Sequence, residues 1–137
     1  MFLTKTVTSL SGLGSFVAYF AVAVLLLIVF ARVYSWITPY REFQLIGGGN
    51  AAAACSMGGA ILGFAIPLAS VIAHSAGLID MIIWGIIALL VQLGAFMAVK
   101  MIFPTIISDI PKNQLSKGVF LGIVSLAVGI LNAACMS

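Results

Sequence analysis

Three consecutive glycines, residues 47–49, precede a run of alanines and raise the possibility of a phosphate-binding loop. A loop that binds a nucleotide also needs a lysine for the phosphates and a serine or threonine for magnesium. Here Asn50 and four alanines follow the glycines, and the next lysine is Lys100. The sequence therefore argues against a nucleotide-binding site at these glycines.

The single histidine, His74, and the nearby Asp80 are further candidates for acid–base or metal chemistry. The two side chains could titrate as a pair or contribute ligands to a metal shared between subunits. A solvated turn is the simpler expectation, because one histidine cannot hold a metal alone and no HExxH, Ser–His–Asp or Cys–His arrangement accompanies it. We expect neither a cofactor nor enzymatic activity.

The elements that must position these residues are membrane-spanning helices. Of the 137 residues, 64% are hydrophobic and 7% are charged, and the mean hydropathy is +1.30, whereas soluble domains carry about 25% charged residues. A spanning helix needs roughly 20 apolar residues, and the apolar stretches do not alternate as barrel strands would. We therefore predict an all-α integral membrane protein with four helices, near residues 13–37, 51–73, 79–103 and 117–135.

The basic residues predict how these helices cross the membrane. Five of the six lie at or between the first and second helices and the third and fourth helices, and Lys5 alone lies near the N-terminus. By the positive-inside rule both basic loops are cytoplasmic and both termini are outside, with residues 1–12 as an extracytoplasmic segment and 74–78 as an outer turn. We expect an inner aromatic belt of Tyr34, Trp36 and Tyr40. Nucleic-acid binding is not expected, because no basic stripe is present.

The chain also contains an internal repeat. Residues 13–73 and 79–137 each read as a long helix, a proline, a polar basic turn and a helix rich in small residues. Residues 63–70 correspond to 129–136 at an offset of 66 positions. Because each unit has two spans, both copies enter the membrane from the same side, which predicts parallel repeats.

Small residues recur along one face of the second and fourth helices. Such stripes let another backbone approach closely, so we predict that these two helices are the packing helices. Their partners could lie in the same chain or in another one. Because four spans enclose little interior, we expect a homo-oligomer in the lipid bilayer. The predicted packing positions are Cys55, Gly59, Gly63, Gly118, Gly122, Ser125, Gly129 and Ala133.

Several polar or helix-breaking residues fall inside the predicted spans. Pro67 lacks an N–H, so it frees the carbonyl of Gly63 and predicts a kink, with Ser70 available to satisfy freed backbone groups. Gln92 and Asn132 are amides that need a protein or water partner. They could bond between helices or line a water-filled path. No charged residue lies mid-membrane, unlike in most proton-coupled transporters.

Four segments together resemble the domain of unknown function 350 (DUF350) family: YSWITPYREFQLI, GGAILGFAIPLAS, IALLVQL and GILNAACM. The resemblance covers nearly the whole chain. It implies a bacterial inner-membrane protein built from two copies of a two-helix unit. It also implies gene neighbourhoods that include membrane-maintenance proteins of the phage-shock type and ATP-grasp ligases. It implies no particular reaction.

We therefore expect a non-enzymatic, oligomeric inner-membrane protein associated with membrane stress. It would be an anchor or scaffold whose basic loops recruit a phage-shock-like or other cytoplasmic membrane-stress protein. The alternative is a small oligomeric channel lined by Gln92 and Asn132. The scaffold is favoured because the sequence offers no charged ring to set ion selectivity. The expected loop contacts are Arg41, Glu42, Lys112 and Lys117.

Overall fold

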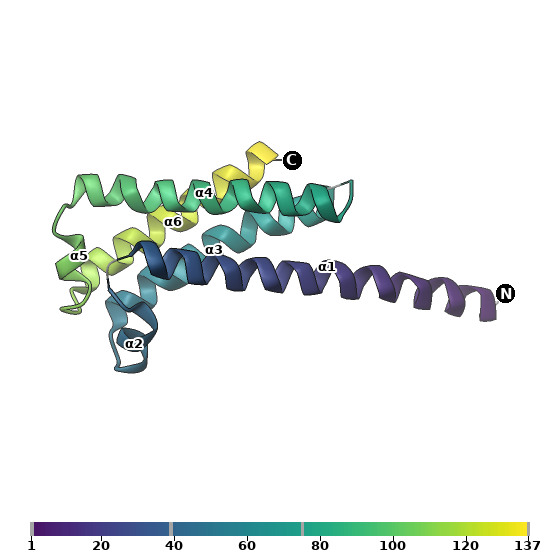
Figure 1. Ribbon diagram of the computed structural model, residues 1–137, viewed down its shortest axis with the longest axis horizontal. Coiled ribbons are helices and arrows are strands. Elements are labelled where there is room, and N and C mark those ends of the chain that lie inside the picture. The colour runs from purple at the N-terminus through teal and green to yellow at the C-terminus, as the bar shows by residue number, and fades with distance from the viewer. Residues whose placement is uncertain (1, 39, 75, 137) are drawn as a thin grey trace.

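The computed structural model describes residues 2–38, 40–74 and 76–136. All of the long secondary-structure elements among these residues are α-helices. Four helices are long and apolar enough to cross a membrane: α1 Phe2–Ile37, α3 Ala51–His74, α4 Leu78–Ile102 and α6 Leu115–Met136. Two short helices, α2 Glu42–Gly47 and α5 Ile106–Asp109, lie in the two loops at one end of the bundle (Figure 1). The four predicted spans are thus confirmed as helices of membrane-crossing length and composition.

The main difference from the predicted boundaries is the start of α1. The helix begins at Phe2 instead of near residue 13, so the predicted N-terminal segment is helical from its second residue onward. At about 1.5 Å per residue, a helix of this length exceeds the hydrocarbon thickness of about 30 Å. Its N-terminal end accordingly extends beyond the other helices (Figure 1). Ser75, in the predicted outer turn, lies outside the described residues.

The centre of the bundle is the contact between α3 and α6, which run in the same direction. A Cβ atom added to Gly118 would overlap the backbone of Ala52, and one added to Gly129 would overlap the backbone of Gly63. Between them, Gly122 lies against the carbonyl of Cys55. The two small-residue stripes therefore face each other within one chain, which answers the question that the sequence left open.

Helices α1 and α4 pack on this pair through aromatic side chains. Phe30 of α1 stacks on Phe64 of α3 with ring centroids 4.5 Å apart, and Tyr34 meets Phe96 of α4 edge to face at 5.7 Å. Tyr34 and Tyr40 are both buried. The expectation that they belong to a lipid-facing aromatic belt is therefore wrong, because both rings complete the core. Trp36 is exposed and remains available to the interface.

The loop end of the bundle is held by two asparagines. Asn50 donates from Nδ2 to the carbonyl of Ile110 at 2.8 Å, and its Oδ1 accepts the N–H of Ala53 at 2.9 Å. Asn113 has a φ of 60° and its Oδ1 accepts the N–H of Ala52 at 3.1 Å. These bonds satisfy backbone N–H groups in the first turn of α3, which have no partner within the helix. They also fix the α5 loop against α3.

Candidate functional site

The polar centre of the membrane region is built around Pro67. Because Pro67 has no N–H, it cannot supply the helical hydrogen bond that the carbonyl of Gly63 would otherwise accept. Gln92 of α4 donates from Nε2 to this carbonyl at 2.9 Å and lies 3.0 Å from the carbonyl of Ser125 on α6. Its side chain is fully buried. Gln92 of α4 thus forms hydrogen bonds to both α3 and α6 and links the three helices.

The residue expected to serve the freed backbone has a different partner. Ser70 donates to the carbonyl of Ala133 on α6 at 3.2 Å. The carbonyl of Gly63, which Pro67 leaves without a helical donor, accepts its hydrogen bond from Gln92 of α4 instead of from a residue of α3. Asn132 is half-buried near the other end of α6, and its Nδ2 has no partner among the described residues. The structure does not bring Asn132 together with Gln92 through any described hydrogen bond.

The two other candidates for chemistry flank the turn between α3 and α4. His74 lies with Nδ1 2.8 Å from the carbonyl of Ser70, and Asp80 accepts the N–H of Ala76 at 3.3 Å. Each side chain therefore contacts backbone in its own neighbourhood. Within the described residues, no three His, Cys, Asp or Glu side chains gather in a way that could hold a metal. A metal contributed across subunits stays a hypothesis.

Of the four residues predicted to contact a partner from the loops, three have side chains that are exposed or half-buried at the end that carries α2 and α5. Arg41 and Lys112 are exposed. Lys117 is half-buried, pairs with Asp109 at 3.4 Å and lies 5.4 Å from the centre of the Phe103 ring. Arg41 and Lys112 are the exposed basic residues of the two loops at this end, and we call these two residues the basic pair.

Glu42 does not fit the role predicted for it. Its side chain is 0% exposed, so it cannot contact a soluble partner in this conformation. The side chain turns into the bundle, where Oε1 contacts the hydroxyl of Thr38. Burial raises the pKa of the Glu42 carboxyl from 4.5 to about 7. Nothing in the sequence indicates this burial, because a glutamate beside Arg41 in a loop normally faces water.

The surroundings of Glu42 contain further buried hydroxyl groups. Tyr40 and Tyr34 are both close enough to interact electrostatically with Glu42. Burial, with a smaller contribution from Glu42, raises the pKa of Tyr40 above its usual range. The Oε2 of Glu42 is buried without a hydrogen-bond partner among the described residues, and the hydroxyls of Tyr34 and Tyr40 lie near those of Ser125 and Ser56. This cluster was not predicted, and its only signal in the sequence is the closely spaced Tyr, Thr, Tyr and Glu of residues 34–42.

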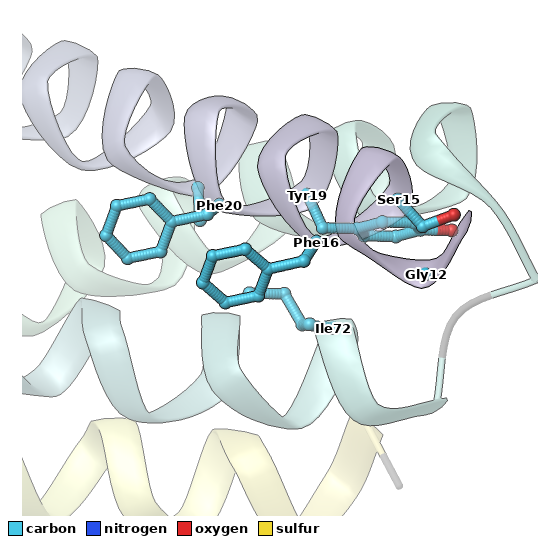
Figure 2. A pocket seen from close by; sticks show the side chains of 7 residues that line it. Gly12, Ser15, Phe16, Tyr19, Phe20 and Ile72 are labelled. Carbon is cyan, nitrogen blue, oxygen red and sulfur yellow. The ribbon is translucent and has the colours of Figure 1, made fainter. Parts of the chain in front are cut away.

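An apolar groove lies far from this cluster, between residues 12–23 of α1 and the C-terminal end of α3. It has a volume of about 440 Å³, and Phe16, Tyr19 and Ile72 are among the side chains that line it (Figure 2). The rings of Phe16 and Phe20 stack at 5.7 Å along its wall. Most of the lining side chains are aromatic or aliphatic, and such side chains suit contact with lipid or another helix.

Comparisons with known proteins agree with the membrane architecture. A family model described as Domain of Unknown Function (DUF350) matches residues 8–136. The inner membrane protein YjfL of Escherichia coli (strain K12) is 41% identical over 128 residues, which cover 93% of this chain and 97% of that protein. The transmembrane protein YshE of Bacillus subtilis (strain 168) is 30% identical over 119 residues, covering 85% and 89%. No solved structure matches the chain significantly.

Proposed function

The chain belongs to the DUF350 family, and we propose that it is a non-enzymatic, oligomeric scaffold that recruits soluble membrane-stress proteins to the bacterial inner membrane. The basic pair, Arg41 and Lys112, carries this proposal. Both side chains are exposed at the end of the bundle where five of the six basic residues lie at or near the loops. Such a surface suits an acidic patch on a cytoplasmic partner or anionic headgroups beside it.

The proposed orientation puts the basic pair in the cytoplasm and both chain termini outside. It rests on the positive-inside rule, which counts lysines and arginines in short loops. Lys5 is the single basic residue near the opposite end. With this orientation the exposed surface of α2 and α5 faces the compartment in which soluble stress-response proteins act.

The packing also supports the proposed pair of parallel repeats. Gly63 and Gly129 are in contact and are 66 positions apart in the sequence, and the same holds for Ala52 and Gly118. The same offset relates residues 63–70 to 129–136 in the sequence. Contacts between equivalent positions are expected when a two-fold axis runs along the membrane normal between two copies. The repeats would then place one basic loop from each copy at the same end.

The interior favours a scaffold over the alternative of a channel. Gln92 is buried within a single chain and is hydrogen-bonded to backbone, so a pore between subunits would not be lined by it. The Nδ2 atom of Asn132 is likewise buried within the chain. Oligomerisation would instead use lipid-facing surface. Helix α1 supplies a long stretch of it, because most of its large hydrophobic side chains between Phe2 and Val29 are exposed.

Proximity labelling in cells tests the scaffold. A biotin ligase fused near the basic pair should label a defined set of soluble proteins, and the double substitution Arg41→Glu and Lys112→Glu should remove most of that labelling. Lys5→Glu is the control, because it reverses one positive charge at the other end of the bundle and should have no effect. Labelling that is equal in all variants would contradict a role for the basic pair.

Two measurements separate the scaffold from the channel. Native mass spectrometry from membranes should give more than one copy per particle, whereas a strictly monomeric protein would refute the oligomer. Purified protein in liposomes should leave ion flux at the level of empty liposomes. A reproducible flux that depends on the protein would favour the channel instead.

A further inference from the structure

Glu42 is a buried acid with no basic partner. The chain has three acidic residues, and Asp109 pairs with Lys117 while Asp80 lies partly exposed in the first turn of α4. Glu42 forms no ion pair with any described residue, and its side chain is 0% exposed. An isolated carboxylate in such a site costs several kcal/mol. The site must therefore supply either a proton or a cation.

The hydrogen-bond count at Thr38 points to the proton. The Thr38 hydroxyl lies 3.2 Å from the carbonyl oxygen of Tyr34 and 3.3 Å from that of Ser35, and it also contacts Oε1 of Glu42. A hydroxyl has one hydrogen to donate and can accept with its oxygen. If Thr38 donates to its own helix, as Ser and Thr commonly do, the hydrogen in the contact with Glu42 has to come from the carboxyl group.

We propose that Glu42 is a proton-binding site at the loop end of the bundle, in which the carboxylic acid donates from Oε1 to the Thr38 hydroxyl. Ionisation breaks this O–H bond, passes the proton to water and leaves the carboxylate among neutral groups. The titratable groups that face it are the hydroxyls of Tyr34 and Tyr40, and both would repel the carboxylate only if they ionised as well. The neutral Oε2, which has no partner, is tolerated far better than a carboxylate oxygen would be.

The bound proton would also hold α2 in place. Glu42 is the one residue of α2 that is fully buried, whereas Phe43 is 54% exposed. Loss of the proton would charge the residue that α2 inserts into the bundle, and water would have to reach it. Proton release would therefore loosen α2 next to Arg41. This inference does not depend on the proposed scaffold, because it concerns the site itself.

Infrared difference spectroscopy on the full chain in lipid nanodiscs can test the site directly. The carbonyl stretch of a protonated carboxylic acid should be present at about pH 5 and vanish by about pH 9, a range in which ordinary carboxyls with a pKa of about 4 stay ionised. The midpoint should lie near 7, shifted from the usual 4.5. Three acidic side chains in the chain make the assignment simple.

Two variants and one exchange of salt decide the outcome. Glu42→Gln, which keeps the shape of the neutral acid, should abolish the band, whereas the control Asp80→Asn should retain it. Replacing Na⁺ by a bulky organic cation should leave the midpoint unchanged. A band that persists in Glu42→Gln, no band at about pH 5, or a midpoint that falls as Na⁺ is added would each overturn the proposal, and the last result would indicate a metal-cation site.

Discussion

Gly63 and Gly129 lie against each other where α3 crosses α6, and a Cβ atom on Gly129 would overlap the carbonyl group of Gly63. Neither a leucine nor even an alanine fits between the two backbones. The contact brings α3 and α6 together without any side chain between them, in the manner of small-residue stripes in other membrane proteins.

Substituting Gly129 by alanine should therefore destabilise the bundle. We expect a loss of about 1–3 kcal/mol, the usual range for overpacking, because the obstructing atoms are backbone and cannot rotate away. Gly94→Ala is the matched control, since no atom lies within 4 Å of the Cβ it would gain. Reversible unfolding in mixed micelles measures both. Equal stabilities for the two variants would mean that α3 and α6 do not touch at this point.

The asparagine cap at the start of α3 gives a second prediction. Asn50→Ala removes the bond to the carbonyl of Ile110 and the cap on the Ala53 N–H. It should cost about 0.5–2 kcal/mol of stability and speed hydrogen exchange in the first turn of α3. Gln114→Ala, at an exposed side chain in the same loop region, serves as the control. Unchanged exchange in Asn50→Ala would argue against the cap.

The sequence predicted the four spans because length and hydropathy alone determine which segments can cross a bilayer. It also located the positions of close helix approach, since glycines at four-residue spacing need no knowledge of the partner. It could not identify that partner. The contact between Gly63 and Gly129 joins residues far apart in the chain, and a partner in a second subunit would have produced the same pattern.

Glu42 and Tyr34 illustrate what local sequence could not reveal. A glutamate after an arginine and a tyrosine at a helix end are both typical of the membrane interface. Their burial depends on the chain folding back after α1, so that Thr38 meets Glu42 and Tyr34 meets Phe96. The early start of α1 was missed for a different reason: Lys5 and the Thr and Ser residues near it suggested a polar segment, yet none of them prevents a helix.

Glu42 should make stability depend on pH. Its pKa is raised from 4.5 to about 7 in the folded protein, so between these values the unfolded chain loses a proton that the folded chain keeps. Stability is therefore greatest below about pH 4.5, falls as the pH rises and levels off above about pH 7. The total loss should be about 3 kcal/mol, at about 1.4 kcal/mol per pKa unit. The free energy of unfolding measured across this range should fall with pH in Asp80→Asn and be nearly constant in Glu42→Gln. A pH dependence that persists in Glu42→Gln would have to come from another group.

The proposed orientation can be checked with reporter fusions. Alkaline phosphatase, which is active only outside the cytoplasm, should be active when fused after the C-terminus and inactive when inserted at Lys112. The reason is the distribution of basic residues, five of which lie at the loop end or near it. A cytoplasmic reporter should give the reverse pattern. The opposite pattern of reporter activities would show that the topology is inverted and that the basic pair lies outside the cytoplasm.

The last prediction concerns Gln92 and Pro67, which we expect to be energetically coupled. Gln92→Leu removes the donor that lies 2.9 Å from the carbonyl of Gly63. With Pro67 in place this carbonyl has no helical N–H to accept, so it would be left unsatisfied in the apolar interior. The expected cost is about 1–3 kcal/mol, which is above the roughly 0.6 kcal/mol of an average hydrogen bond between membrane helices.

Restoring an N–H at position 67 should reduce that cost. In a Pro67→Ala background the carbonyl of Gly63 regains a donor from its own helix, and Gln92→Leu should then change stability by less than about 0.6 kcal/mol. A double-mutant cycle over the four proteins measures the coupling, which should exceed about 0.5 kcal/mol. Gln92→Leu with Ser70→Ala is the matched cycle, because Ser70 bonds to Ala133 instead and should add independently. Additivity in both cycles would show that Gln92 does not serve the carbonyl freed by Pro67, and its burial would then need another explanation.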